Sequence, residues 1–266
     1  MPEPLFAGFA ARKNRRCGVV GLLALFVAAS VSGIVAAEQI ATTAARAQTA
    51  YFAGNAAELG RLAADISPWA KSQNARELYA YAYVQFRVLQ LAIGGKREDE
   101  AKRAGAACVA ALDAAVQREP KFAEAFALQS ACYGYLANLG GMAAIRNGSR
   151  SGKSMEAALA LDARSPRILL VDGFGVYFRP KFVGGDKAKG CARFREAAAG
   201  FDTAASGAAA PAGVPSGGID WGAAEAHYWS GRCARDTGDA AGARKAFERA
   251  LAIAPDFLAA SRALGR

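Results

Sequence analysis

The sequence predicts an all-α fold in which antiparallel helix pairs stack in a row as an α-solenoid. Alanine is frequent along the chain, and alanine favours helices because it loses no side-chain entropy there. Gly-Asn, Gly-Asp, Gly-Gly and X-Pro steps divide the chain into segments of helix length. Each pair of helices is expected to bury two faces against its neighbours, so about five pairs and a C-terminal cap helix share one continuous core.

The last helix pair, residues 224–255, carries the clearest pattern. Residues 238–239, Gly-Asp, interrupt its helical run. Small residues, one aromatic residue and a proline fall at positions 8, 20, 24, 27 and 32 of this segment: Gly231, Ala243, Phe247, Ala250 and Pro255. This pattern resembles the tetratricopeptide repeat, a helix–turn–helix of 34 residues with small residues and one aromatic on its packing faces. His227 and Ala234 stand at positions 4 and 11, where the family prefers Trp and Tyr.

The same helix and turn signals divide the rest of the chain. We predict degenerate tetratricopeptide-like pairs over residues 38–202, an Ala/Gly/Pro-rich connector over 203–220, and the last repeat with its cap helix over 221–266. The expected helices before the connector cover residues 38–53, 56–66, 74–92, 97–118, 122–139, 151–162, 166–178 and 186–202. Asn55 and Asp186 are expected to cap helix N-termini, and a polar stretch before residue 151 is expected to be a loop.

Residues 1–37 are predicted to be a secretory signal peptide or an N-terminal membrane anchor. Four basic residues precede an uncharged run from Gly18 to Ala37, which ends in small residues suited to cleavage. The run of 20 residues is also long enough to span a bilayer if it is not cleaved. In both cases the rest of the chain faces the outside of the inner membrane, so we expect a periplasmic protein or one that is anchored there.

The charge of the chain and its distribution argue against nucleic acid as a partner. Removal of residues 1–37 takes away four basic residues and Glu3, which lowers the formal charge from +10 to +7. The remaining chain has no compact cluster of Lys and Arg interleaved with aromatic residues, so nucleic-acid binding is not expected. Membrane contact is expected only through residues 18–37, and only if they are retained.

Three features together resemble a group of bacterial periplasmic tetratricopeptide proteins. They are the predicted signal, the Phe-x-Gly-Gly-Asp loop at residues 182–186, and the Trp-Gly-x-x-Glu-Ala opening of the last repeat at residues 221–226. The resemblance extends over most of residues 38–266 and is specific over 166–255. It implies an exported, non-enzymatic scaffold that binds a protein or peptide in the cell envelope. The alternatives are a membrane-anchored subunit of an envelope or secretion complex that docks through its outer face, and an enzyme with an unrecognised site.

Four cysteines remain after the predicted signal, and an even number in an exported chain favours disulfides. Cys108 lies 12 residues before Pro120 and Cys132 lies 12 residues after it, so antiparallel helices joined there bring both to one height. In repeat numbering Cys191 and Cys233 also join a second helix to the next first helix. We predict Cys108–Cys132 and Cys191–Cys233. The alternative is that four buried free cysteines replace alanine; a zinc site is not expected, because Cys-x-x-Cys spacing and additional histidines are absent.

A partner-binding groove is predicted from the repeat register, because the first helix of each pair lines the concave side of a solenoid. The residues placed there are Tyr79, Tyr83, Arg87, Glu124, Tyr135, Tyr228, Arg232 and Arg235. Tyrosine and arginine suit peptide segments, since they supply rigid contact area and forked hydrogen bonds. The helical spacing of Tyr79, Tyr83 and Phe86 fits a packed core equally, and both interpretations stay open.

No constellation of residues predicts catalysis or a cofactor. Residues 152–154, Gly-Lys-Ser, resemble the end of a phosphate-binding loop, but the required first glycine is Asn147 and a helix is expected before it. We expect Ser151 to cap a helix instead. His227 is the only histidine, so no histidine relay is available, and its repeat position favours packing. Asp172 has no carboxylate partner at a useful spacing.

Overall fold

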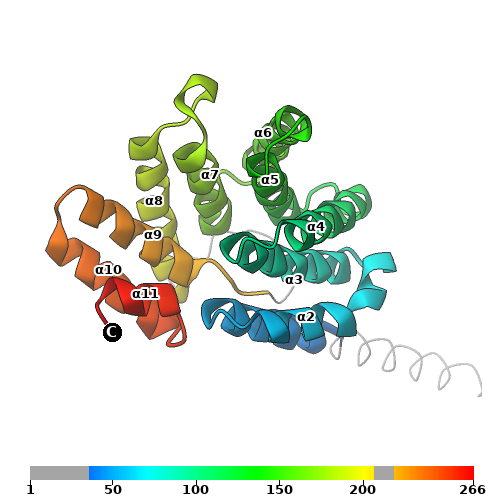
Figure 1. Cartoon of the computed structure of the whole chain (residues 1–266), viewed down its shortest axis with the longest axis horizontal. Helices are drawn as coiled ribbons and strands as arrows, with labels where there is room; N and C mark the ends of the chain where they lie inside the picture. Colours follow the sequence, from blue (N-terminus) through cyan, green and yellow to red (C-terminus); the bar gives the residue numbers. More distant parts are fainter. Residues whose placement is uncertain (1–35, 207–218) are drawn as a thin grey trace, which may run out of the picture. The chain divides into compact units, whose positions relative to one another are not determined.

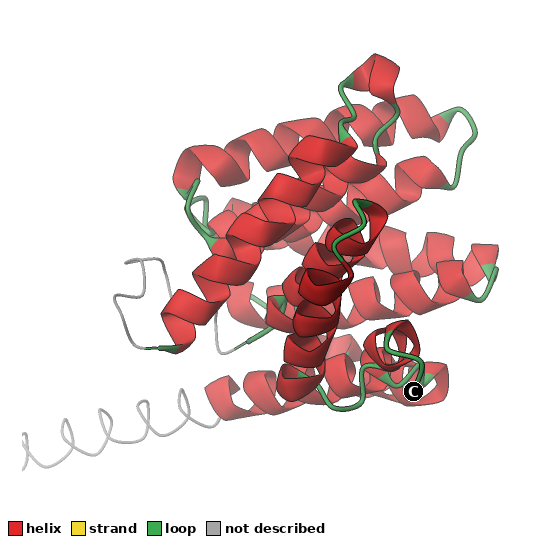
Figure 2. Ribbon diagram, turned by 90° about the vertical axis from the view of Figure 1, so that its left-hand side faces the viewer, coloured by secondary structure: helices red, strands yellow, loops and turns green. Residues whose placement is uncertain are grey.

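The structure, a computed structural model, describes residues 36–206 and 219–266. Residues Gln39–Arg266 form one compact unit. The predicted signal up to residue 35 and residues 207–218 of the predicted connector lie outside the described residues. Every regular element of the described part is a helix (Figure 2), which confirms the all-α prediction. In this part no helix is long and apolar enough to cross a membrane.

The helices follow one another as antiparallel pairs (Figure 1). Residues 36–52 are helical, and the elements after them are α2 (Ala56–Asp65), η1 (Ser67–Lys71), α3 (Ala75–Gly94), α4 (Glu98–Arg118), α5 (Ala123–Asn138), α6 (Ala143–Leu161), α7 (Pro166–Phe178), η2 (Lys181–Val183), α8 (Lys187–Ala205), α9 (Ala223–Asp236), α10 (Ala240–Ile253) and α11 (Leu258–Ala263). The closest partners are α3 with α4, α5 with α6, α7 with α8, and α9 with α10. The fold is therefore an α-solenoid of helix pairs.

Asx residues cap the second helix of three pairs. The side-chain oxygens of Asn55, Asp186 and Asp239 each accept a hydrogen bond from the backbone N–H three residues later, at 3.0, 3.0 and 2.8 Å. Each bond satisfies a donor that the first turn of a helix leaves unpaired. The capping roles predicted for Asn55 and Asp186 are thus present in the structure.

The second helix of the third pair starts earlier than the sequence predicts. α6 begins at Ala143, so the polar stretch that was expected to be a loop is its first two turns. Ser151 is therefore inside the helix and not its N-cap. Its hydroxyl donates to the Ser130 carbonyl at 2.9 Å, and the Ser154 hydroxyl donates to Gln129 at 2.6 Å. Packing against α5 stabilises this helix despite its weak intrinsic preference. Similarly, α8 continues past the predicted end at residue 202.

The two ends of the row of pairs contact each other. The ring centroids of Phe52, in the first described helix, and Phe257, before α11, lie 4.2 Å apart. Tyr228 of α9 lies 5.0 Å from the same Phe257 ring. Both phenylalanines are buried, so the contact is part of the core. Stacking in a row predicts contacts between neighbouring pairs only, whereas the first helix here also packs against the last repeat.

Candidate functional site

The inner face of α3 carries a stripe of large polar residues. Tyr79, Tyr83 and Arg87 recur every four residues, which places them one above another on a single helix face. Their exposed fractions are 0%, 0% and 1%. Such burial of three polar side chains requires hydrogen-bond partners for each of them.

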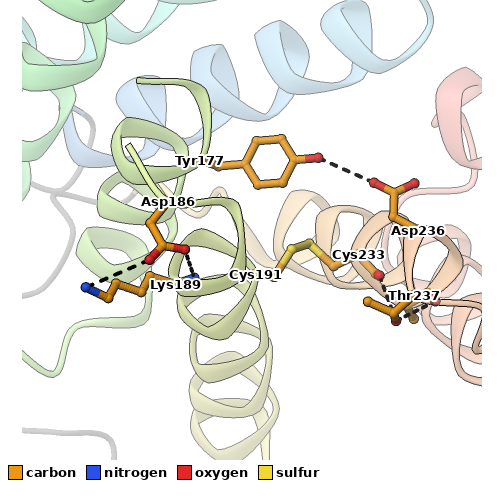
Figure 3. The surroundings of a disulfide bond; sticks show 8 residues. Tyr177, Asp186, Lys189, Cys191, Cys233, Asp236 and Thr237 are labelled. Carbon is orange, nitrogen blue, oxygen red and sulfur yellow. Dashed lines mark hydrogen bonds and ion pairs between the residues drawn. A yellow bond between two sulfur atoms is a disulfide. The ribbon is translucent and has the colours of Figure 1, made fainter. Parts of the chain in front are cut away.

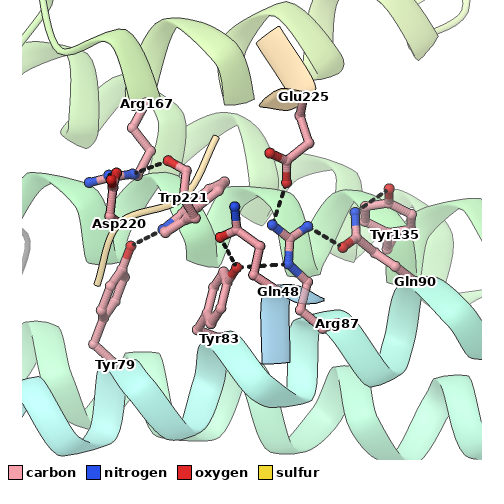
Figure 4. Close-up of polar contacts among 10 residues, drawn as sticks. All are labelled: Gln48, Tyr79, Tyr83, Arg87, Gln90, Tyr135, Arg167, Asp220, Trp221 and Glu225. Atoms are coloured by element: carbon pink, nitrogen blue, oxygen red, sulfur yellow. Dashed lines mark hydrogen bonds and ion pairs between the residues drawn. The ribbon is translucent and has the colours of Figure 1, made fainter. Parts of the chain in front are cut away.

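One partner comes from the segment that leads into α9. The indole Nε1 of Trp221 donates to the Tyr79 hydroxyl at 2.9 Å (Figure 4). The indole ring also lies 5.6 Å from the ring of Tyr83. Gly222 follows in a left-handed conformation, with φ of 106°, which lets the chain turn at once into α9. Trp221 itself is 2% exposed. The indole of Trp221 therefore covers the face of α3 that carries Tyr79 and Tyr83.

Arg87 is the centre of the buried network. Its Nε donates to the Tyr83 hydroxyl at 3.1 Å, its Nη1 donates to Gln90 at 2.8 Å, and its Nη2 pairs with the carboxylate of Glu225 (Figure 4). The Tyr83 hydroxyl in turn donates to Gln48 of the first helix at 3.0 Å. The network thus joins the first helix, α3 and α9, three elements that are distant in the sequence.

A second buried arginine, Arg167, also contacts Trp221. Arg167 of α7 donates from Nε to the Trp221 carbonyl at 2.9 Å. Its other nitrogens pair with Glu124 of α5 and, at 3.5 Å, with Asp220. Its guanidinium carbon lies 5.4 Å from the indole ring centre. The guanidinium carbon of Arg87 lies 5.6 Å from the same ring centre. Two cations therefore contact the indole, which is favourable for its π system.

Burial fixes the protonation states in this network. Burial raises the pKa of Tyr83 to about 12, against an opposing effect of Arg87. Burial also raises the pKa of Tyr79. Burial alone would lower the pKa of Arg87, but Tyr83 and Glu225 outweigh it and hold that pKa above its ordinary value. At neutral pH Tyr79 and Tyr83 are therefore neutral and Arg87 is charged.

The structure divides the predicted groove residues into two sets. Tyr79, Tyr83 and Arg87 lie inside the core, where Trp221 covers them. They are not on an open groove in this structure, because Trp221 packs against all three. Glu124 is bound to Arg167, and the Tyr135 hydroxyl accepts a hydrogen bond from Gln90 at 3.1 Å.

The remaining three predicted residues form a surface on α9. Tyr228 and Arg232 are partly exposed and Arg235 is exposed. The Arg232 guanidinium lies 5.2 Å from the ring centre of Trp229 and donates to the Tyr228 hydroxyl at 3.4 Å. The nitrogen Nε of Arg232 is buried without a hydrogen-bond partner. We call Tyr228, Trp229, Arg232 and Arg235 the α9 face.

A cluster of aromatic rings packs against Trp229 of the α9 face. The rings of Phe174, Tyr177, Phe178 and Phe194 lie 5.2 to 5.8 Å from that of Trp229, mostly tilted or edge-on. Edge-to-face contacts of this kind are favourable beyond the area they bury. Trp229 is itself partly exposed, so the cluster presents a rigid aromatic surface to solvent.

The four cysteines lie in two pairs at bonding distance. The sulfur atoms of Cys108 and Cys132 are 2.03 Å apart, and those of Cys191 and Cys233 are 1.97 Å apart. The first pair joins α4 to α5 and the second joins α8 to α9 (Figure 3). Both pairs therefore connect a second helix to the first helix of the following pair.

The weaker sequence candidates have structural roles. Residues 152–154 are in the middle of α6, so they form no phosphate-binding loop. His227 is buried, and its Nε2 lies 3.3 Å from an Asp202 oxygen that also accepts from Arg249 at 2.8 Å. Asp172 pairs with Arg193 at 2.9 Å. Within residues 36–206 and 219–266, no group of three or more His, Cys, Asp or Glu side chains is placed to hold a metal ion.

Sequence reasoning missed four central residues: Arg167, Trp221, Glu225 and Trp229. Trp221 and Glu225 belong to the Trp-Gly-x-x-Glu-Ala stretch. This motif was recognised in the sequence, but the contacts of both residues with α3 were not predicted from it. A lone Trp after a Pro/Gly-rich connector and a Glu in a helix that buries its neighbours were the available signals. Arg167 gave a weaker signal, because an arginine after Pro166 at a helix start is normally solvated.

Comparison with known proteins agrees with the helix-pair architecture. Residues 224–257 match the family model of the tetratricopeptide repeat. Among solved structures, the HusA haemophore from Porphyromonas gingivalis is similar, with a TM-score of 0.58 and 20% sequence identity. The alignment covers 76% of this chain and 94% of that chain. At this identity the likeness shows the fold alone. No curated protein sequence matches the chain.

Proposed function

We propose that this protein is an exported, non-enzymatic scaffold that binds a protein or peptide segment in the cell envelope through its α9 face. Tetratricopeptide repeats use the first helix of a pair for such contacts, and α9 is the first helix of the matched repeat. The bacterial periplasm is the expected compartment, since residues 1–37 have the composition of a secretory signal.

The cysteine pairs support export. Disulfides persist in oxidising compartments and are rare in the cytosol. Both pairs lie at bonding distance, and Cys108 and Cys132 are 0% exposed, so a role in redox catalysis at the surface is not favoured for them. The pairs are instead suited to holding successive helix hairpins together outside the cell.

The composition and support of the α9 face carry the proposal. Trp, Tyr and Arg are the residues most enriched among energetic hot spots of protein interfaces. On α9 they are adjacent, partly exposed and held by ring contacts, so little side-chain entropy is lost when a partner binds. Arg232 has a buried Nε without a hydrogen-bond partner, so a carboxylate or carbonyl of a bound peptide could supply the missing acceptor.

The test is capture of partners from the envelope with the mature chain, residues 38–266, as bait. Arg232→Glu is expected to lose the captured protein, because it reverses the charge beside Trp229. Lys245→Glu is the matched control, since it makes the same reversal at an exposed position of α10. If both variants capture the same protein as the unaltered chain, the α9 face is not the binding site. That result favours the alternative of a subunit that docks into an envelope or secretion complex through its outer face and N-terminal anchor.

A second candidate function is suggested by the fold likeness to a haemophore together with the aromatic cluster. Trp229 is partly exposed, Phe178 is exposed, and their rings are in edge-on contact, so together they offer an apolar surface against which a flat molecule such as haem can pack. Arg232 beside them is suited to a carboxylate of such a cargo. Titration of the mature chain with haemin, followed by visible absorption, tests it. A saturable spectral change that Trp229→Ala abolishes supports a carrier, and unchanged spectra exclude it.

A further inference from the structure

Exposed large apolar residues gather at two neighbouring hairpin turns. At the turn between α5 and α6, Met142 is 100% exposed and Ile145 is 85% exposed. At the turn between α7 and α8, Phe178 is 52%, Phe182 is 89% and Val183 is 50% exposed. Single exposed apolar residues are normal on a protein surface, but a group of them marks an interaction site. We call these five residues the turn edge.

Topology places both turns at the same edge of the fold. α5 and α7 are the first helices of successive antiparallel pairs, and they contact each other directly (Figure 1). Because each pair returns the chain to its starting side, α5 and α7 run in the same direction. Their C-terminal ends, and the turns that follow, therefore lie side by side.

The turn edge has an excess of positive charge. The two turns, residues 139–146 and 178–189, contain one carboxylate, Asp186, and five basic residues: Arg146, Arg179, Lys181, Lys187 and Lys189. Asp186 caps α8 by accepting from the Lys189 backbone N–H, and its other oxygen lies 3.8 Å from the Lys189 ammonium. The two turns together therefore carry five basic groups against one carboxylate, a formal charge of +5 − 1 = +4.

Backbone hydrogen bonds hold the Phe182 turn in one shape. The Gly185 N–H donates to the Pro180 carbonyl at 3.0 Å, and the Asp186 N–H donates to Val176 at 2.9 Å. A Cβ added at Gly185 would lie 1.7 Å from the Arg179 carbonyl oxygen, so only glycine permits this close approach. Phe182 is thus exposed on a turn whose conformation is fixed by backbone hydrogen bonds.

The flanking turns differ in chemistry. The turn between α3 and α4, residues 94–100, contains three carboxylates and no large apolar residue after its opening glycines. The turn between α9 and α10, residues 236–239, is Asp-Thr-Gly-Asp. Among the described hairpin turns after α3, only the α5–α6 and α7–α8 turns therefore combine exposed apolar side chains with basic ones.

We propose that the turn edge docks on the surface of an anionic lipid bilayer. Phe182 and Met142 enter the interfacial region, while the flanking lysines and arginines keep their charged groups at the lipid phosphates. A lipid surface fits better than a protein partner, because hot spots of protein interfaces lie in packed, water-excluding patches. Phe182 instead stands on a short protruding turn with cations around it, which suits a fluid, negatively charged interface.

The proposal is tested by vesicle co-sedimentation of the chain from residue 38, which contains the whole compact unit and both cysteine pairs. We expect binding to vesicles that contain phosphatidylglycerol and little binding to phosphatidylcholine alone. Phe182→Ser is expected to weaken binding at least about tenfold, from the apolar area it removes from the interface. Lys181→Glu is expected to weaken it by about fivefold or more, and added salt to weaken it further.

Leu161→Ser is the matched control, because Leu161 is 42% exposed at the opposite end of α6 from Met142. Circular dichroism shows that each variant is folded before its binding is compared. The proposal fails if the unaltered chain does not bind phosphatidylglycerol vesicles, or if Phe182→Ser and Met142→Ser bind as well as Leu161→Ser. It also fails if Phe182→Ser leaves vesicle binding intact and removes capture of an envelope protein, since the edge then binds protein.

Discussion

α3 and α9 carry similar stripes of residues and use them differently. On α3 the stripe is Tyr79, Tyr83 and Arg87, all at most 1% exposed. On α9 the stripe of Tyr228, Arg232 and its neighbours is partly exposed. The difference arises because residues 219–222 lie against α3, where Trp221 fills the space that a ligand would otherwise occupy. A stripe of aromatic residues and arginine therefore becomes core or exposed surface according to which other segment of the chain packs over it.

The largest expected effect comes from removing the covering side chain. Trp221→Ala is expected to lower the free energy of unfolding by about 4–5 kcal/mol, since it leaves a cavity and an unpaired Tyr79 hydroxyl. Trp229→Ala is expected to cost only about 1–2 kcal/mol, because its ring is partly exposed. Urea unfolding followed by circular dichroism measures both. Equal losses for the two variants would remove the distinction between α3 and α9.

The buried ion pair gives the next largest effect. Glu225→Ala is expected to cost about 3–4 kcal/mol, because it leaves the charge of Arg87 buried without its carboxylate. The double variant Arg87→Met/Glu225→Leu is expected to recover most of that loss, since apolar replacements need no charge partner. A double-mutant cycle from urea unfolding checks this. If Glu225→Ala is as stable as the unaltered chain, the network does not lock α9 onto α3.

How far the sequence predicted this structure depends on the range of the contacts. Helices, caps such as Asn55, and the packing of Gly231 on Phe247, where an added Cβ would lie 2.8 Å from the ring, follow from local patterns and repeat spacing. The contact of Phe52 with Phe257 joins the first described helix to the segment before α11. Repeat register describes only neighbouring pairs, so it could not predict that contact.

Repeat register placed Tyr79, Tyr83 and Arg87 together on one face of α3, but it could not show that Trp221 covers that face. The position of Trp221 depends on a hydrogen bond to Tyr79 across 142 residues of sequence. The groove on α9 stays a prediction. The early start of α6 also escaped prediction, because Asn147, Gly148 and Ser149 have low helix propensity although they lie in the first turns of this helix.

The two cysteine pairs are expected to stabilise the fold by slightly different amounts. Replacing Cys191 and Cys233 with alanine is expected to cost about 3–4 kcal/mol, slightly more than replacing Cys108 and Cys132, because the closed loop spans 42 residues instead of 24. Non-reducing peptide mass mapping of exported protein first establishes the pairing. Four free thiols in that protein would contradict both the pairing and the stability prediction.

The smallest expected effect is a pH dependence near α9. Burial lowers the pKa of His227 below its ordinary value of 6.5, even though Asp202 opposes the shift. The unfolded chain therefore binds more protons below about pH 6.5, and the free energy of unfolding decreases as the pH falls through this range. His227→Gln is expected to flatten this slope between pH 7 and pH 5. An identical slope in the variant assigns the titration to other groups.

The most direct test of the central claim compares the two tryptophans in solution. Trp69→Phe/Trp229→Phe leaves only Trp221, and Trp69→Phe/Trp221→Phe leaves only Trp229. Acrylamide quenching of each folded variant measures how far water and solutes reach the indole. The structure predicts blue-shifted emission and several-fold weaker quenching for Trp221, which is 2% exposed, than for Trp229. Quenching of Trp221 equal to or stronger than that of Trp229 would contradict the account, because the α3 stripe would then lie open.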